Sequence, residues 1–301
     1  MNQLRSNGND NDSWWSKIKT ATKKAIETGA LSPIPTKSQI IEQSNIPFVV
    51  RIIDNLARKE KATKKQKKDK NFNPFLPYDE NLYVGDITPS HVAILNKFNV
   101  VDHHLLIVTR EFESQDDVLN IDDFSALWSV LSEMDGLAFY NGGKSAGSSQ
   151  PHKHLQLVPY PLADGVKTAP IDNLILSNKK NEEIITLLEF PFVHKVVFLP
   201  SDKNLSIDDL AQVSCELYLQ LLKLVGISIE ENKPSQHYNL LVTKEWMTIV
   251  PRSQESFANI PVNSLGFSGT FLVKNQEGLD KFKVYKPIDI LKEVGIESSN
   301  E

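Results

Sequence analysis

Short runs of apolar residues recur along this chain and predict a set of β-strands. A buried strand shows as roughly four to eight residues that are continuously apolar or that alternate with polar ones. Five segments fit this description: residues 46–53, 104–108, 137–140, 152–158 and 196–199. Pro159 ends the fourth of them, which agrees with a turn at that point.

Apolar residues at helical spacing predict three helices, over residues 13–27, 122–135 and 206–224. The first has Ser13 as its cap and one apolar face made of Trp14, Ile18, Ala21 and Ala25. The second is expected to stop at Gly136. In the third, Ser206 and Asp209 have the spacing of a capping box.

The order of these elements indicates an α+β fold. Strand, helix, strand, Gly/Ser-rich loop and strand follow one another within residues 104–158, which is typical of an antiparallel sheet with helices. Residues 106–112 and 240–246 also share four identities. Two explanations stay open for this echo: chance similarity between ordinary strands, or two related sheet units in one molecule.

Composition narrows the class of protein. The 301 residues hold 33 Lys and Arg against 38 Asp and Glu, a net charge of −5. A single cysteine excludes a disulfide framework and a multi-cysteine metal cluster. The apolar runs fall far short of the about 20 residues that span a bilayer. Because the polar, Asn-rich start is unlike a secretory signal, we expect a soluble, cytoplasmic protein with no membrane partner.

A basic tract interrupts this mildly acidic chain. Arg58–Lys70 holds eight basic residues against Glu60 and Asp69. Such a tract can contact nucleic acid or polyphosphate, but a solvated loop is the more common structure. The acidic total charge disfavours a nucleic-acid partner.

Residues 150–156, Gln-Pro-His-Lys-His-Leu-Gln, carry the clearest chemistry. On a strand, His152, His154 and Gln156 would project from one face, because side chains alternate with a period of two. Burying each of these groups without a partner would cost about 1–3 kcal/mol. The structural alternative is an edge strand, or core histidines that are hydrogen-bonded; the functional alternative is a reactive row.

The loop before this row favours the functional alternative. Residues 142–143 and 147–150 are rich in Gly and Ser, and such loops present backbone N–H groups and hydroxyls to phosphate oxygens. Gly143-Lys144-Ser145 resembles the end of a P-loop, but Ala138 stands where that motif needs its first glycine. A histidine row beside an anion-binding loop predicts phosphoryl chemistry.

A metal site is the other explanation of the row. His-x-His on a strand can bind zinc, but a third protein ligand has to come from elsewhere. The remaining histidines show no diagnostic spacing: His91, His103, His104, His194 and His237. The sequence therefore predicts no protein metal site.

Four separated motifs together resemble ATP adenylyltransferase, also called diadenosine tetraphosphate phosphorylase, of the histidine triad superfamily. They are residues 96–110 (Asn-Lys-Phe-Asn-Val-Val-Asp-His-His-Leu-Leu-Ile-Val-Thr-Arg), the loop 147–150, the row 152–156 and residues 263–274. The resemblance runs from about Ile46 to Asp280. It implies a histidine-triad-like antiparallel sheet with flanking helices.

The resemblance also implies an activity. Such enzymes cleave diadenosine tetraphosphate with inorganic phosphate to ATP and ADP, through an AMP–histidine intermediate. His154 matches the nucleophile, and His152 would orient it through hydrogen bonds that fix its tautomer. Gln156 stands where the hydrolases keep a histidine, and glutamine there goes with transfer to phosphate rather than to water. Whether ADP with sulfate is also a substrate pair stays open at this point.

Further site residues and cofactors follow from the same resemblance. The implied nucleotide and phosphate contacts are Lys59, Asn96, Lys97, Asn141, Gly147, Ser148, Ser149, Gln150, Asn263, Thr270 and Lys274. Mg²⁺ is expected to accompany the substrate, without a tightly bound cofactor. The expected partners are diadenosine polyphosphates, ATP, ADP and phosphate.

We predict three regions from these motifs: an N-terminal helical extension over residues 1–45, a catalytic domain over 46–200, and a C-terminal region over 201–301 that completes the nucleotide site. Two alternatives stay open. A hexose-1-phosphate uridylyltransferase shares the His-x-His-x-Gln row, although Lys153 and Leu155 depart from its usual His-Pro-His-Gly-Gln. A non-catalytic nucleotide-binding or nucleic-acid-binding protein would use the basic tract.

Overall fold

A computed structural model describes residues 13–53, 72–179, 184–202 and 204–298. Its centre is a nine-stranded sheet in which every neighbouring pair is antiparallel. In spatial order the strands are β3 (Tyr83–Thr88), β4 (His91–Leu95), β5 (Leu105–Thr109), β7 (His154–Pro159), β6 (Gly136–Gly142), β12 (Tyr238–Val242), β13 (Trp246–Pro251), β9 (Lys195–Phe198) and β8 (Ile184–Ile185).

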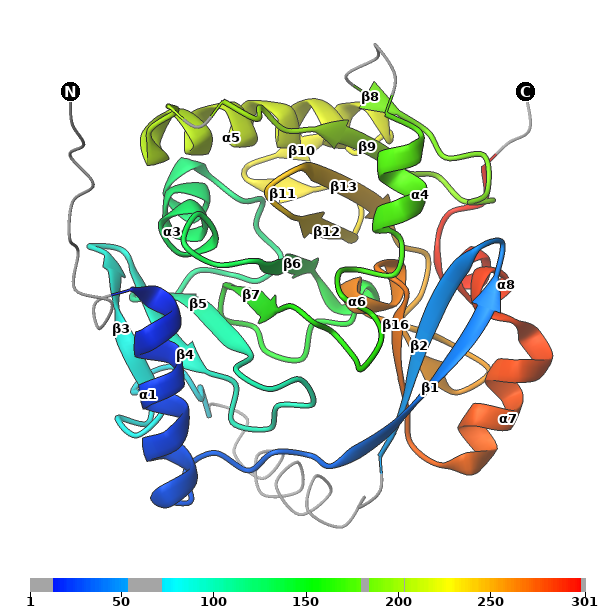
Figure 1. Ribbon diagram of the computed structural model, residues 1–301. Coiled ribbons are helices and arrows are strands. Elements are labelled where there is room, and N and C mark those ends of the chain that lie inside the picture. The colour runs from blue at the N-terminus through cyan, green and yellow to red at the C-terminus, as the bar shows by residue number, and fades with distance from the viewer. Residues whose placement is uncertain (1–12, 54–71, 180–183, 203, 299–301) are drawn as a thin grey trace, which may run out of the picture.

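A smaller sheet and several helices surround this sheet (Figure 1). The smaller sheet holds β1 (Thr36–Gln43), β2 (Ile46–Ile53) and β16 (Thr270–Val273), and the two hairpins are β10–β11 (Ile229–Glu230, Lys233–Pro234) and β14–β15 (Ser256–Phe257, Ile260–Pro261). The helices are α1 (Trp14–Glu27), α3 (Ile121–Leu131), the 3₁₀ turn η2 (Lys144–Ala146), α4 (Asp172–Ser177), α5 (Ile207–Leu224), α6 (Ser264–Phe267), α7 (Gln276–Tyr285) and α8 (Pro287–Val294).

The two faces of the large sheet are covered differently. Helices α1, α3 and α5 pack on one face, where a single apolar cluster joins them to strands from β4 to β9. On the other face, the smaller sheet and helices α4, α6, α7 and α8 cover the strands of the second half. Above β4, β5 and β7, the described residues place only a small cluster around Phe75 on the same face. That part of the sheet is therefore available to form a pocket.

The sheet is built from two units with the same topology. In the first, β4, β5, α3, β6 and β7 follow in sequence and lie in the order β4-β5-β7-β6; in the second, β8, β9, α5, β12 and β13 lie in the order β8-β9-β13-β12. The units meet where β6 pairs with β12. The echo between residues 106–112 and 240–246 relates β5 to β12, which occupy different places in the two units. The echo is therefore not a trace of this repeat.

Local signals predicted most elements correctly. The Ser13 and Ser206 side chains cap α1 and α5 as expected, and Ser206 with Asp209 forms the predicted capping box. The second helix was predicted four residues too long. It ends at Leu131, and Gly136 begins β6 instead of ending the helix, because Met134 continues the helical spacing beyond the last turn of the helix.

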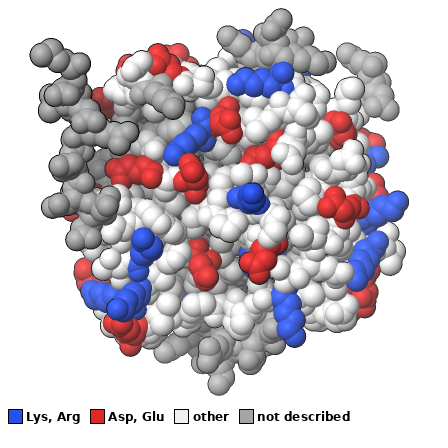
Figure 2. Space-filling view, viewed as in Figure 1, with Lys and Arg blue, Asp and Glu red and all other residues white. Residues whose placement is uncertain are grey.

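Charge is mixed over the visible surface. On the face in Figure 2, Lys and Arg side chains alternate with Asp and Glu and form no broad patch of one sign. The basic tract Arg58–Lys70 lies outside the described residues. No helix in the described ranges is both long and apolar enough to cross a membrane.

Candidate active site

A pocket of about 1150 Å³ lies on the open part of the sheet. Its floor includes His154 and Gln156 on β7, and its walls come from the segment before β3, the β4–β5 turn, the Gly/Ser loop and the region around α6. His154 and Gln156 share this face while Leu155 and Leu157 point into the helix-covered core. The alternation predicted for the row is observed.

The His154 imidazole has one defined tautomer. Its Nδ1–H donates to the backbone carbonyl oxygen of His152 at 2.8 Å, because a carbonyl oxygen can only accept. Nε2 therefore carries the free lone pair. Burial lowers the pKa of His154 to about 4, so the ring is neutral at physiological pH. The backbone N–H of His154 is held by Gln115 Oε1 at 2.8 Å.

His152 supports the site from just outside β7. Its Nε2–H donates to the Thr109 carbonyl oxygen at 2.8 Å, and its Nδ1 lies 3.0 Å from Asn73 Nδ2. Phe75 and Phe112 contact the ring edge-on. The hydrogen bond that was expected from His152 to fix the tautomer of the nucleophile is made by its backbone carbonyl, which accepts from His154 Nδ1–H.

The Gly/Ser loop lies beside His154. Gly143 and Gly147 have φ of 96° and 88°, a backbone conformation that favours glycine. Gly147, Ser149 and Gln150 line the pocket. The Ser148 hydroxyl instead donates to the Gln150 carbonyl oxygen at 3.0 Å, which closes the loop on itself.

Replacing Gly147 with Ala should reduce turnover of the expected substrate, diadenosine tetraphosphate, much more than replacing Gly165 with Ala. Both glycines have positive φ, so both variants carry similar backbone strain. A Cβ at Gly147 would lie 2.9 Å from Asn263 Cβ, whereas one at Gly165 meets nothing within 4 Å. We expect about tenfold lower kcat/KM for Gly147→Ala and less than about threefold for Gly165→Ala. Equal effects in steady-state assays would contradict this account of the loop.

Asn141 joins the loop to the C-terminal part of the chain. Its Oδ1 accepts from the Ser264 backbone N–H at 2.9 Å and from Asn239 Nδ2 at 3.0 Å. Arg252, which is almost fully buried, in turn donates to Asn239 and to the Val262 carbonyl oxygen. Asn141 lines the pocket, but its side-chain oxygen Oδ1 already accepts hydrogen bonds from Ser264 and Asn239. This network was not predicted, because its members are scattered along the sequence.

The remaining predicted contacts divide into two groups. Asn96, Lys97, Asn263 and Thr270 line the pocket. The Thr270 hydroxyl is buried without a hydrogen-bond partner among the described residues, and a bound ligand can satisfy such a group. Lys274 is exposed and is not part of the pocket lining. Lys59 lies outside the described residues.

Several residues that line the pocket were not predicted from the sequence. An apolar wall of Phe75, Tyr78, Leu82, Ile94 and Leu106 offers a surface for a planar base. Arg51 on β2 adds a cation, and its position inside an apolar strand was the available signal. His104 was considered only as a possible metal ligand. Its Nε2 lies 3.1 Å from Gln156 Oε1.

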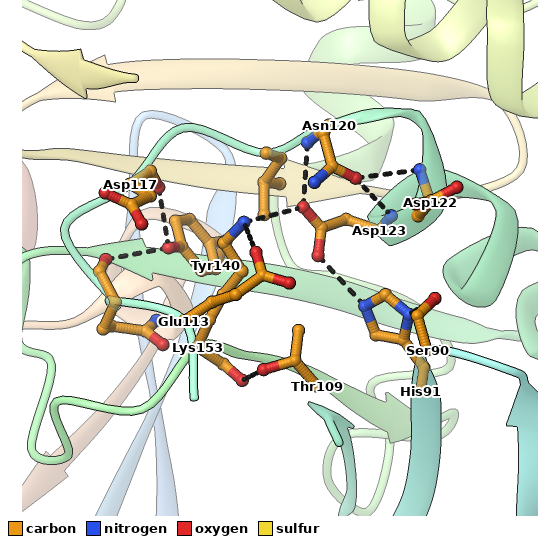
Figure 3. Close-up of polar contacts among 12 residues, drawn as sticks. Ser90, His91, Thr109, Glu113, Asp117, Asn120, Asp122, Asp123, Tyr140 and Lys153 are labelled. Atoms are coloured by element: carbon orange, nitrogen blue, oxygen red, sulfur yellow. Dashed lines mark hydrogen bonds and ion pairs between the residues drawn. The ribbon is translucent and has the colours of Figure 1, made fainter. Parts of the chain in front are cut away.

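A cluster of ion pairs surrounds Lys153, whose side chain points away from the pocket that His154 and Gln156 line (Figure 3). Lys153 Nζ lies 3.1 Å from Asp123 Oδ2 and 2.7 Å from Glu113 Oε2, and His91 Nε2 lies 3.0 Å from Asp123 Oδ1. Burial would raise the pKa of Asp123, but hydrogen bonding to His91 and the Lys153 charge outweigh it and lower that pKa. The same carboxylate caps α3 by accepting from the Asn120 N–H. Lys153 thus ties the segment between the two histidines to α3.

Known protein families and relatives match this chain over most of its length. Residues 5–177 match the Ap4A phosphorylase N-terminal domain, and residues 188–297 match the ATP adenylyltransferase C-terminal domain. Diadenosine 5',5'''-P1,P4-tetraphosphate phosphorylase 2 of Saccharomyces cerevisiae is 32% identical over 79% of each chain. Protein APA1 of the same yeast is 28% identical over 95% of each chain.

Solved structures agree. The crystal structure of yeast Ap4A phosphorylase Apa2 covers 95% of each chain at 28% identity with a TM-score of 0.78. The complex of that enzyme with Ap4A matches with the same TM-score at 27% identity, over 95% of this chain and 98% of the other. The chain therefore belongs to the Ap4A phosphorylase family, the ATP adenylyltransferases.

Proposed function

We propose that this enzyme phosphorolyses diadenosine tetraphosphate (Ap4A) to ATP and ADP through a covalent AMP adduct on His154. The observation that carries the proposal is the free Nε2 lone pair of a neutral His154, which faces a pocket with a Gly/Ser loop beside it. The family relationship and the match to an Ap4A complex support the substrate. ATP, ADP and phosphate are then the further ligands.

Two displacements complete the reaction. His154 Nε2 attacks the α-phosphorus of one AMP unit, the bond to the bridging oxygen breaks, and its electron pair leaves with ATP. An oxygen of inorganic phosphate then attacks the same phosphorus, the P–N bond breaks, and its electron pair returns to Nε2 as ADP forms. While the adduct exists, His154 Nδ1–H continues to donate its hydrogen bond to the His152 carbonyl oxygen, and this bond stabilises the positive charge on the ring.

The loop and the bound cation have supporting roles in this proposal. The backbone N–H groups of Gly147 and Ser148 already donate to the carbonyl oxygens of Lys144 and Gly143. The backbone N–H groups of Ser149 and Gln150 and the Ser149 hydroxyl would therefore receive the α-phosphate oxygens, where charge develops during transfer. In the described residues, no group of three or more His, Cys, Asp or Glu side chains is arranged to bind a metal ion. We propose that Mg²⁺ is bound by the substrate phosphates rather than by a protein site. A cytoplasmic location stays a prediction from the sequence.

An assay with and without phosphate tests the reaction. We expect ATP and ADP from Ap4A only when phosphate is present, because the second phosphorus of ADP comes from inorganic phosphate. Multiple turnovers to ATP and AMP without phosphate would show a hydrolase instead. Conversion of UDP-glucose with galactose 1-phosphate would show a uridylyltransferase. Product analysis by ion-exchange chromatography separates these outcomes.

The first displacement should tolerate acid unusually well. An ordinary histidine, with a pKa of about 6.5, is mostly protonated at pH 5 and cannot attack phosphorus. Because burial lowers the pKa of His154 to about 4, its ring keeps the lone pair until the pH falls toward that value. Single-turnover release of ATP from Ap4A, without phosphate, measures this step alone. A midpoint near pH 6.5 in a protein still folded by circular dichroism would contradict the assignment.

A further inference from the structure

Gln156 presents its side-chain amide to the pocket, and the orientation of that amide is set by two neighbours. His104 Nε2 lies 3.1 Å from Gln156 Oε1, and His104 Nδ1 lies 3.2 Å from Asn96 Nδ2. His104 immediately precedes β5, and β5 pairs with β7, the strand that carries Gln156. Its ring also packs against Phe139, which restricts its rotation.

The directions of the Asn96–His104 and His104–Gln156 hydrogen bonds follow from one donor whose identity is certain, a backbone N–H. The Phe98 backbone N–H donates to Asn96 Oδ1 at 3.3 Å, so the Asn96 nitrogen faces His104. An amide nitrogen only donates, so His104 Nδ1 must accept. Burial lowers the pKa of His104 to about 4, so the ring is neutral and has one N–H. That N–H is therefore on Nε2, and it donates to Gln156 Oε1.

We propose that His104 is a positioning residue that locks Gln156 as a hydrogen-bond donor toward the transferred phosphoryl group. With Oε1 engaged, the amide nitrogen faces the pocket. It has no protein partner within the described part of the chain. Its two N–H groups can then bind anionic phosphoryl oxygens. This inference rests on the proposed function and assigns a role that His154, His152 and the loop do not fill.

The hydrogen bond from His104 to Gln156 also affects whether phosphate or water attacks the AMP–His154 adduct. A flipped Gln156 would place its carbonyl oxygen toward the adduct, where it repels phosphoryl oxygens and can accept a hydrogen bond from water. Water oriented in that way competes with phosphate for the AMP–His154 phosphorus. The hydrogen bond from His104 removes this acceptor, so it favours ADP as the product over AMP.

Variants of His104 test the proposal through two readouts. His104→Phe keeps a planar ring but loses the N–H, and we expect kcat to fall about 10- to 100-fold with KM changed by less than about threefold. The AMP-to-ADP product ratio should rise in the same variant. His104→Gln can place an amide N–H near the former Nε2 and should recover most of both properties. Thermal unfolding shows whether each variant is folded.

A double-mutant cycle with Gln156→Ala separates positioning from a structural role. If His104 acts through Gln156, His104→Phe should cost little further activity in the Gln156→Ala background. An equal loss of kcat in both backgrounds, or an unchanged product ratio in His104→Phe, would overturn the role of His104. Failure of the wild-type chain to convert Ap4A and phosphate to ATP and ADP would instead overturn the proposed function.

Discussion

Replacing His154 with Ala is expected to lower kcat for Ap4A phosphorolysis by about 10⁴-fold or more, because the adduct cannot form without Nε2. The loss should appear equally in the single-turnover release of ATP. Intact-protein mass spectrometry gives a second measurement. The wild-type chain mixed with Ap4A in the absence of phosphate should gain the mass of one AMP residue, and His154→Ala should gain none.

His103 provides the matched control for that variant. It lies between β4 and β5, the strand that pairs with the β7 strand of His154, but its ring contacts Trp15 and hydrogen-bonds to Thr22 on the helix-covered face. Its φ of 59° is left-handed, and asparagine tolerates that conformation. His103→Asn should therefore keep kcat within about threefold. Adduct formation or near-normal turnover in His154→Ala would exclude His154 as the nucleophile.

Replacing Lys153 with Met should destabilise the fold by about 3–5 kcal/mol, because it leaves the Asp123 carboxylate buried without its cation. Asp123 has no exposed surface, and Lys153 is only 2% exposed. The free energy of unfolding from urea denaturation measures the effect. Lys244→Met is the matched control, since Lys244 pairs with Asp135, which is 83% exposed. Loss of such an exposed pair costs about 0–1 kcal/mol.

The pH dependence of that difference identifies its cause. In the wild type the pKa of Asp123 is lowered by His91 and Lys153, so its contribution is present at neutral pH and is lost only as pH falls through that lowered pKa. In Lys153→Met, burial raises the pKa of Asp123, and the carboxyl takes up a proton at milder acidity. The stability difference should therefore shrink between pH 7 and pH 5. An unchanged difference would point to lost packing rather than an uncompensated charge.

Local patterns along the chain were sufficient for most elements and for the centre of the site. The caps at Ser13 and Ser206 are made by residues within three positions of each other, so the sequence contains the whole interaction. The face shared by His154 and Gln156 follows from the period of two along a strand. The end of α3 was missed because Met134 continues the helical spacing although the chain has already turned toward β6.

The sequence by itself determined which residues carry chemistry, namely the histidine row and the Gly/Ser loop before it. It also excluded a cysteine framework. Only the tertiary structure decided their states. The lone pair on His154 Nε2 depends on how the backbone places the His152 carbonyl two residues before it. The donor role assigned to Gln156 and the charge of buried Lys153 depend on partners from other elements, His104 and Asp123. Spacing along a chain fixes direction within one element, but proton positions and charges depend on what packing brings within about 3 Å.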